Sequence, residues 1–314
     1  MKILVTGGAG FIGSHIVEYF QGREDVRVLD NLRSGFEHNL DGFRCELMLG
    51  SILDRDILRR AMKGVDYVFH LAAMTSVPES MQKPEECNEL NTLGTLLVLE
   101  EAAQAGVKKL IFSSSAAIYG DNPTIPKLET MSPEPKSPYA ITKLDGEYYC
   151  QTFTDECRLP TTCLRYFNVF GPRQNPQSQY ASAVPNFIHR AVRHEPIVIY
   201  GDGKQSRDFI YVNDIVAANV FFAMQSAATG IFNIAKGQAT QINDLAAMIC
   251  RMTESRSVIR HAPERSGDVK HSLASIAKLG ISGFTPSVDL SDGILATLEN
   301  EAPPNFAGAS FFRP

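Results

Sequence analysis

Three glycines, each three residues after the last, follow the first apolar segment of this 314-residue chain. Gly7, Gly10 and Gly13 come directly after Ile3–Val5, and a helical pattern begins near residue 11. In such a turn one glycine allows the tight bend, one lets backbone approach a pyrophosphate, and one lets helix and strand pack closely. The first turn of the helix adds partial positive charge. The segment therefore predicts a strand–turn–helix unit that binds a dinucleotide.

Short apolar runs alternate with helical patterns through the first half of the chain. Strands joined by helices form right-handed βαβ units and a parallel sheet. We therefore predict an α/β fold with a Rossmann-type, doubly wound parallel sheet. The expected strands are Ile3–Val5, Val26–Leu29, Val65–Phe69, Lys109–Phe112 and Thr161–Tyr166; the expected helices are 11–21, 54–63, 88–105 with Gly106 after its end, one beginning at Ser137-Pro138, and one that follows a strand within 208–222.

The composition of the sequence changes near residue 172, where prolines and glycines become more frequent and the expected helices and strands become shorter. We predict that 1–171 and about 205–228 form the larger, dinucleotide-binding domain. About 172–204 and 229–300 are expected to form a smaller α/β substrate lobe, mostly C-terminal. Residues 301–314 form a tail to which we assign no role.

A carboxylate marks the end of the second expected strand. Asp30 lies 17 residues after Gly13, where an acidic side chain accepts hydrogen bonds from the adenosine ribose. Such a carboxylate repels a 2′-phosphate, so the sequence favours NAD over NADP. The nearby Arg33 weakens that preference, because guanidinium groups bind phosphate. Small residues in Leu71-Ala72-Ala73, after another strand, suit a flat cofactor.

A tyrosine and a lysine are placed on one face of a later helix. Tyr139 and Lys143 are four residues apart, so they share a face. A nearby ammonium favours the phenolate and is expected to lower the tyrosine pKa from about 10, making it a usable base. Ser113-Ser114-Ser115 follow a strand at the sheet edge where ligands bind. A serine there can hydrogen-bond a reacting hydroxyl and relay its proton.

Bulk properties restrict the partners. A net charge of −5 argues against nucleic acid or an anionic membrane as the main partner. The six cysteines form no CxxC pair, so we expect reduced thiols, no metal site and a cytoplasmic location. Neither a signal peptide nor an apolar run of about 18 residues is present, so no membrane span is expected.

Five motifs together resemble the extended short-chain dehydrogenase/reductases. They are Thr6–Gly13 (TGGAGFIG), His70–Ala73 (HLAA), Ser113–Gly120 (SSSAAIYG), Tyr139–Lys143 (YAITK) and Arg165–Pro172 (RYFNVFGP). Within that family the chain is most similar to the 4-epimerases of UDP-galactose and UDP-N-acetylgalactosamine, from residue 1 to about 300. The resemblance implies NAD as cofactor, a UDP-sugar substrate and a homodimer formed through the helices near 88–105 and 137–157.

The resemblance also implies roles for individual residues. The catalytic group is Ser115, Tyr139 and Lys143. Cofactor contacts are implied for Gly7, Gly10, Phe11, Ile12, Gly13, Asp30, Asn31, Arg33, Ser34, Gly35, Ser51, Ile52, Leu71, Ala72, Ala73, Tyr139, Lys143 and Tyr166, with Phe167 also near the nicotinamide. Substrate contacts are implied for Ser76, Ser115, Tyr139, Asn168, Ala183, Val184, Phe187, Val198, Tyr200, Arg207, Arg265, Asp268 and Ser272. Gly50-Ser51-Ile52 departs from the family, which often has aspartate at the second position.

The reaction is indicated by the residues after Ser115. Dehydratases of this superfamily commonly carry an Asp-Glu pair there, and decarboxylases a nearby glutamate, whereas this chain has Ala116-Ala117. Inversion at C4 needs only one acid/base group and a hydride acceptor, so a UDP-hexose 4-epimerase is favoured. A UDP-glucuronate 4-epimerase or other sugar-nucleotide enzyme stays open. A protein that binds NAD without turnover is disfavoured by the Tyr139–Lys143 pair.

A serine near the end of the chain predicts a wide sugar pocket. Relatives restricted to unacetylated hexoses have a bulky tyrosine beside C2 of the sugar, and Ser272 occupies the matching place. The smaller side chain leaves room for an N-acetyl group. The sequence therefore predicts that UDP-GlcNAc/UDP-GalNAc are accepted as well as UDP-glucose/UDP-galactose, unless Ser272 only ends a loop.

Overall fold

The larger part of the structure is a seven-stranded sheet in which every pair of neighbouring strands is parallel. A computed structural model describes residues 1–176, 182–225, 227–264 and 270–301. The strand order is β10-β6-β5-β4-β1-β2-β3. The strands are β1 (Lys2–Thr6), β2 (Asp25–Asp30), β3 (Glu46–Leu49), β4 (Tyr67–His70), β5 (Lys109–Ser115), β6 (Thr161–Tyr166) and β10 (Gly230–Ile234). The predicted Rossmann-type sheet is confirmed.

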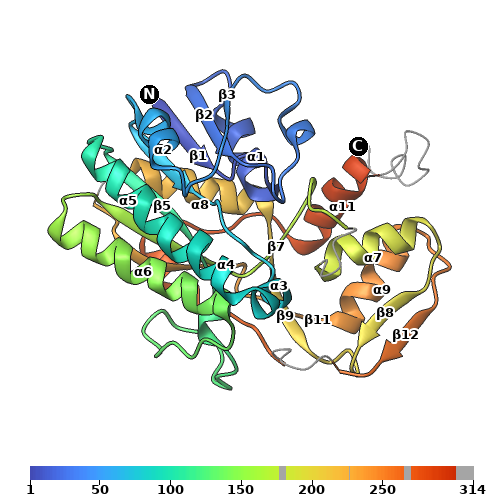
Figure 1. Ribbon diagram of the computed structural model, residues 1–314. Helices are drawn as coiled ribbons and strands as arrows, with labels where there is room; N and C mark the ends of the chain where they lie inside the picture. The colour runs from blue at the N-terminus through green and yellow to red at the C-terminus, as the bar shows by residue number, and fades with distance from the viewer. Residues whose placement is uncertain (177–181, 226, 265–269, 302–314) are drawn as a thin grey trace.

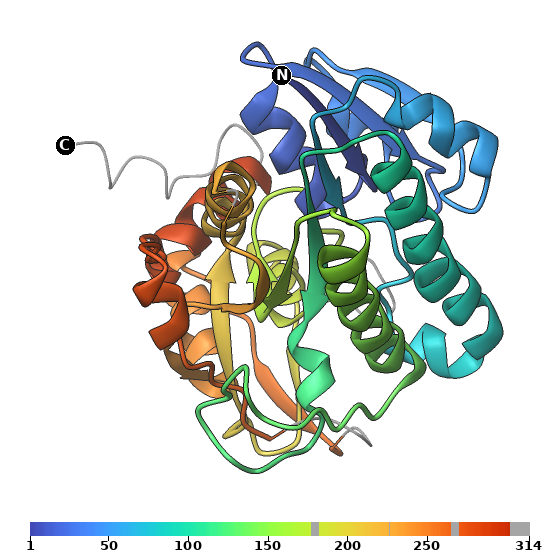
Figure 2. The ribbon, with the colours of Figure 1, turned by 90° about the vertical axis from the view of Figure 1, so that its left-hand side faces the viewer.

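Helices cover both faces of this sheet, as Figures 1 and 2 show. Alternate residues of β1 serve the two layers: Ile3 and Val5 face one apolar cluster, and Leu4 faces the other. The first layer contains α1 (Phe11–Phe20) and α8 (Val212–Met224), and the second contains α2 (Arg55–Met62), α5 (Gly94–Gln104) and α6 (Pro138–Glu156). Within the described residues, no helix combines the length and apolarity needed to cross a membrane.

The helix expected over 88–105 is interrupted. It consists of α4 (Pro84–Asn88), a π-helical turn (Glu89–Leu93) and α5, and it is preceded by the short α3 (Val77–Gln82). Gly106 follows its end with φ +71, as predicted for a residue that closes a helix.

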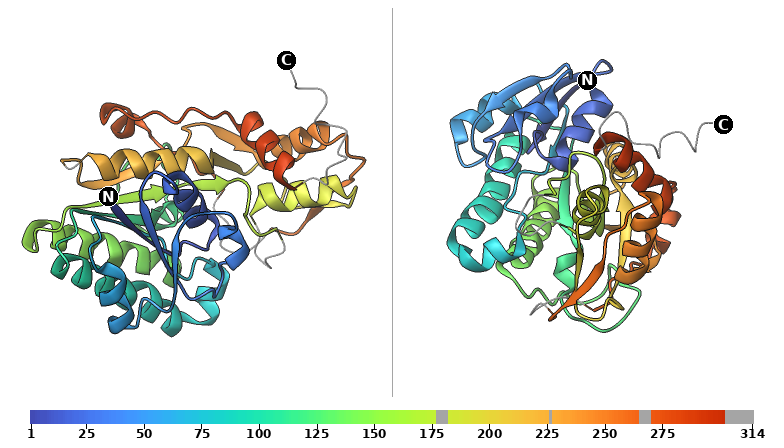
Figure 3. Two further views of the ribbon diagram at one scale, coloured as in Figure 1. Left: turned by 90° about the horizontal axis from the view of Figure 1, so that it is seen from above. Right: turned by 90° about the vertical axis from the view of Figure 1, so that its right-hand side faces the viewer.

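Within the described residues, two smaller sheets and three helices form the second lobe, which lies to one side of the large sheet in Figures 1 and 3. The three-stranded sheet has the order β11-β9-β7, and β8 pairs with β12. The elements are β7 (Asn168–Phe170), α7 (Ala183–Val192), β8 (Ile197–Tyr200), β9 (Ser206–Tyr211), β11 (Ala239–Gln241), α9 (Ile242–Met252), β12 (Ile259–Ala262) and α11 (Leu290–Glu301). The short α10 (Ala277–Ile281) instead contacts β10, and its Leu279 joins the apolar cluster of the large sheet.

The chain crosses between the lobes at other places than expected. We expected everything from about 229 to 300 in the smaller lobe, but β10 pairs with β6 at the edge of the large sheet. The strand within 208–222 exists as β9, yet it pairs with β7 and β11 instead of joining the large sheet. Only the helix that follows this strand, α8, packs against the large sheet, beside α1. The lobe to which β9 and β10 belong depends on strands that are distant in sequence, and the local sequence of β9 or β10 does not encode that pairing.

Candidate active site

A cleft of about 1280 Å³ opens at the carboxyl ends of the parallel strands and is lined from both lobes. Of the predicted site residues that the structure describes, all line this cleft except Ser51. The Ser51 hydroxyl instead accepts a hydrogen bond from the Leu53 backbone N–H at 3.2 Å, in the turn before α2. Arg265, Asp268 and the tail 302–314 lie outside the described residues.

The glycine-rich turn fits a pyrophosphate. Gly7 has φ +71, and a Cβ on Gly13 would lie only 2.2 Å from the Gly7 carbonyl oxygen, so the turn has no room for a side chain there. Among the described residues, no side chain caps the N-terminus of α1, whose first residues Phe11 and Ile12 line the cleft. The backbone N–H groups in the first turn of α1 therefore offer donors to an anion.

The carboxylate of Asp30 is fixed at the end of β2. Its two oxygens accept hydrogen bonds from the backbone N–H groups of Ala9 and Leu32, at 2.9 and 2.8 Å. One of these donors belongs to the glycine-rich turn, so the acid and the turn hold each other in place. A buried carboxylate beside a pyrophosphate site fits a ribose diol and disfavours an additional phosphate.

The three proposed catalytic side chains meet where β5 ends and α6 begins. The Ser137 hydroxyl caps α6 by accepting from the Ala140 N–H at 3.2 Å, and Pro138 occupies the first turn. The Ser115 Oγ accepts from the Ala117 N–H at 3.1 Å and hydrogen-bonds Tyr139. The geometry brings a hydroxyl, a phenol and an ammonium to one edge of the cleft.

The protonation of this group differs from expectation. Burial raises the pKa of the Tyr139 phenol, while the hydrogen bond with Ser115 acts in the opposite direction. The Lys143 ammonium donates to the Ser113 carbonyl at 2.7 Å and lies 5.9 Å from the Tyr139 ring centroid. Burial also lowers the pKa of Lys143 to about 8. The predicted lowering of the Tyr139 pKa is therefore wrong for the protein alone, because desolvation of the phenol outweighs the Ser115 hydrogen bond and the Lys143 ammonium is directed at the Ser113 carbonyl.

A buried ion pair behind the catalytic residues was not foreseen. Glu147 accepts from Arg165 through both carboxylate oxygens, at 2.8 and 2.7 Å, and each side chain is at most 2% exposed. Ser114 donates to the same carboxylate at 2.5 Å, and Arg165 also donates to the Tyr119 hydroxyl at 2.8 Å. Through Ser114, Glu147 and Arg165 these contacts join β5, α6 and β6. Ser114 is the residue before Ser115, and Glu147 is one helical turn after Lys143. One sequence signal existed: Glu147 is four residues after Lys143 and shares its face.

An asparagine in the π-helical turn holds a cleft-lining loop and was also missed. Asn91 accepts from the Met74 backbone N–H at 2.7 Å and donates to the Met74 carbonyl at 3.0 Å. Its amide donates in addition to the Thr142 hydroxyl at 3.1 Å. Asn91 therefore connects the loop after β4 with α6. No local pattern announces a π-helical turn, so the sequence offered no signal.

The segment around Ser272 is fastened to β9. The Ser272 N–H donates to the Ser206 carbonyl at 3.0 Å. The buried Asp208 carboxylate accepts from the backbone N–H groups of Ala274 and Lys236 at 3.1 and 3.0 Å. These contacts place Ser272 in the cleft wall beside Arg207.

The fold and the cleft together define a dinucleotide-dependent enzyme of the Rossmann class. The model of the NAD dependent epimerase/dehydratase family matches residues 3–235. The chain therefore belongs to this family, and its cofactor is NAD. The turn and the acid described above are the residues that fit this cofactor.

The chain is similar to several enzymes that act on UDP-sugars, over nearly the whole length of each. A UDP-N-acetylglucosamine 4-epimerase from Methanobrevibacter ruminantium M1, in complex with UDP-N-acetylmuramic acid, is 41% identical with a TM-score of 0.92, covering 95% of this chain and 97% of that one. A UDP-glucose 4-epimerase with UDP-glucose from Thermotoga maritima is 41% identical with a TM-score of 0.92, covering 96% and 98%. A UDP-N-acetyl-alpha-D-glucosaminuronate decarboxylase from Bacillus cytotoxicus is 34% identical over 95% of this chain and 97% of its own.

Proposed function

We propose that this protein is an NAD-dependent UDP-hexose 4-epimerase that interconverts UDP-glucose and UDP-galactose, and UDP-GlcNAc and UDP-GalNAc. One observation carries the proposal: among the described residues that line the cleft, the carboxylates are Asp30 and Glu195. Asp30 belongs to the adenosine end, and Glu195 is paired with Arg190 at 4.0 Å. Beside Ser115 stand Ala116 and Ala117, so the site offers the single acid/base that inversion needs.

The side chains divide the chemistry among them. Tyr139 accepts the proton of the sugar C4 hydroxyl, and Ser115 hydrogen-bonds that hydroxyl and the phenol. Lys143, anchored on the Ser113 carbonyl, supplies positive charge behind the phenol. NAD, when bound, supplies the hydride acceptor and a cationic ring, and a cation near a phenol favours its ionised form. The 4-keto sugar would turn while its nucleotide stays held, so that C4 would regain its hydride on the opposite face while Tyr139 returns the proton to the C4 oxygen.

The nucleotide half of the substrate is assigned to the smaller lobe. We propose that the parts of about 172–204 and 229–300 outside β10 and α10 bind it together with β7 and β9. Asn168 on β7, Arg207 on β9 and the start of α7 then face the diphosphate and uridine. Arginine suits this task because its planar fork matches phosphate oxygens. Arg265 and Asp268 stay predictions of the same kind. A cytoplasmic location also stays a prediction.

The decarboxylase relative and a UDP-glucuronate 4-epimerase define the alternative. To decide, purified protein is incubated without added NAD with UDP-glucose, UDP-GlcNAc or UDP-glucuronate, and products are separated by anion-exchange chromatography. We expect UDP-galactose and UDP-GalNAc. Conversion of UDP-glucuronate alone, release of CO₂ or a stable 4-keto product would replace the proposal with one of these alternatives.

Replacing Ser272 with tyrosine tests the width of the sugar pocket. A phenol ring in the cleft wall should collide with an N-acetyl group but spare a hydroxyl. We expect kcat/KM for UDP-GlcNAc to fall about 100-fold and that for UDP-glucose to change little, because a steric clash discriminates strongly. Ser272→Ala serves as the control that keeps the space open. An equal loss for both substrates would rule out the gate.

We propose that two copies associate through α5 and α6, which lie side by side in Figure 1. Leu93, just before α5, and Ile141 and Tyr148 on α6 are large apolar side chains that are 43%, 48% and 59% exposed, as expected for a surface that a second copy covers. Light scattering should give twice the 34.6 kDa chain mass. Ile141→Asp together with Tyr148→Asp should give the single-chain mass, and a wild-type protein that is already monomeric would overturn the proposal.

A further inference from the structure

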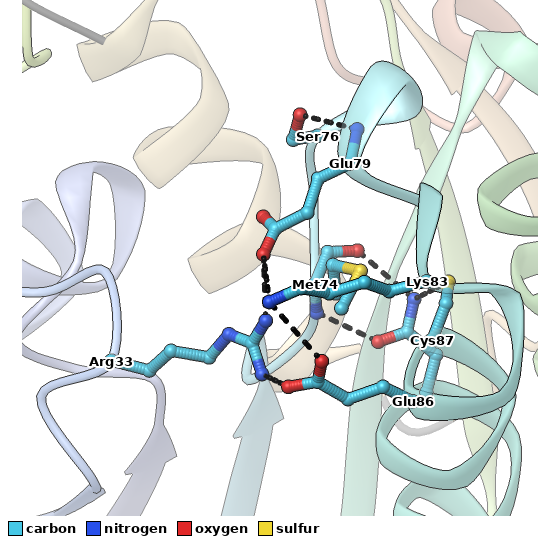
Figure 4. A network of polar contacts seen from close by, with 8 residues as sticks. Arg33, Met74, Ser76, Glu79, Lys83, Glu86 and Cys87 are labelled. Carbon is cyan, nitrogen blue, oxygen red and sulfur yellow. Dashed lines mark hydrogen bonds and ion pairs between the residues drawn. The ribbon is translucent and has the colours of Figure 1, made fainter. Parts of the chain in front are cut away.

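An arginine at the adenosine end of the cleft is held by two glutamates from the opposite wall. Arg33 lies in the loop after β2 and lines the cleft together with Asp30 and Asn31. Its guanidinium pairs with Glu79 of α3 at 2.7 Å and with Glu86 of α4. Figure 4 shows the guanidinium between the two carboxylates. Loop and helices thus meet across the edge of the cleft.

A lysine completes the cluster. The Lys83 ammonium lies 3.8 Å from Glu79 and 3.5 Å from Glu86, between the same two carboxylates in Figure 4. The side chains of Arg33, Glu79 and Glu86 are 29%, 33% and 41% exposed. Solvent therefore reaches these ion pairs, but it only partly screens the attraction between their charges. The hydrogen bond with Arg33 lowers the pKa of Glu86, so the carboxylate stays charged near neutral pH.

The charges around Arg33 bear on which cofactor this end of the cleft accepts. An arginine close to the ribose-binding acid is the residue type that accepts a 2′-phosphate and so admits NADP. Here its planar fork is already occupied by carboxylates, the ligands that compete best with phosphate. With Asp30 included, three carboxylates stand against two cations, so a 2′-phosphate meets net negative charge.

We propose that Glu79 and Glu86 are specificity-determining residues for the cofactor: by pairing with Arg33 they withhold its guanidinium from a 2′-phosphate and keep this enzyme selective for NAD. Asp30 alone disfavours the phosphate, and the two glutamates occupy the Arg33 guanidinium that would otherwise bind it. Selectivity thus depends on side chains about fifty residues beyond Arg33 in the sequence.

The test compares which nucleotide each variant holds. Holoenzyme is equilibrated with equal, excess NAD and NADP and desalted, and the extracted nucleotides are quantified by chromatography. The variant is Glu79→Gln with Glu86→Gln, which removes two charges and keeps both shapes. The control is Glu85→Gln with Glu89→Gln, which removes the same charge from exposed positions of the same helical segment.

We expect the bound NADP:NAD ratio to rise about tenfold in the double variant, since one charge-assisted phosphate contact becomes available. The control should match wild type. Adding Arg33→Ala to the double variant should return the ratio to the wild-type value or below. An unchanged ratio in the double variant, an equal rise in the control, or a rise that survives Arg33→Ala would each overturn the proposal. Thermal melting of every holoenzyme checks folding, and the single variants replace the double one if it melts early.

Discussion

Tyr139→Phe is expected to reduce kcat about 1000-fold or more while the protein still carries its NAD. The phenol oxygen is the one group proposed to move the C4 proton, and removing a general base typically costs between about 10² and 10⁴ in rate. The ring itself stays, so its packing against the apolar core at the start of α6 is kept. Epimerisation of UDP-glucose is measured by product chromatography, and bound NAD by extraction of the purified protein.

A matched control is available on the same helix. Tyr148 is 59% exposed and lies two and a half turns further along α6. Tyr148→Phe should leave kcat unchanged. If Tyr139→Phe keeps kcat within threefold of wild type, the proton is moved by another group. If it loses NAD as well as activity, Tyr139 acts mainly in holding the cofactor.

Glu147→Gln is expected to lower the melting temperature of the holoenzyme by about 10 °C. The substitution leaves the buried Arg165 guanidinium without its counter-charge, and breaking a buried pair in this way costs about 3–5 kcal/mol. Differential scanning calorimetry or intrinsic fluorescence measures the change. Glu156→Gln, at the exposed end of the same helix, is the control and should shift the midpoint little.

A second variant separates charge from packing. Replacing both partners, Glu147→Leu with Arg165→Met, leaves no unpaired charge, so at least half of the lost stability should return. A Glu147→Gln midpoint within about 2 °C of wild type would contradict the importance of the pair. If the double replacement is as unstable as the single one, the hydrogen bonds to Ser114 and Tyr119 matter more than the charges.

The sequence was sufficient for the elements that are locally encoded. The apolar runs at Ile3–Val5 and Lys109–Phe112 are β1 and β5, and the glycine turn opens α1 as predicted. Pairings across long stretches of chain were not predictable. The β3 strand is a partly exposed edge whose apolar run is only three residues long, Leu47–Leu49. The sequence of residues 230–234 contains no signal that this strand pairs with β6.

In the candidate active site, too, locally encoded features were predictable and long-range contacts were not. Tyr139, Lys143 and the glycines were predicted because their spacing alone puts them on one face or in one turn. The Tyr139 pKa was mispredicted because desolvation is created by the whole surrounding fold. The Arg165–Glu147 pair joins residues 18 positions apart on a strand and a helix. The partners of Arg33 lie further away still, so its neutralisation by Glu79 and Glu86 could not be anticipated.

The pairing of β10 with β6 affects how the protein can be made. Six strands of the large sheet, β1 to β6, end by residue 166, but the seventh, β10, is complete only at residue 234. The outer edge of β6 therefore stays unpaired until residue 234 has left the ribosome. Until then the nascent polypeptide exposes an unpaired parallel strand, to which another chain can add. Gene fragments that stop before residue 230 should therefore aggregate during expression, even though they encode the entire glycine-rich turn and the Tyr139–Lys143 pair.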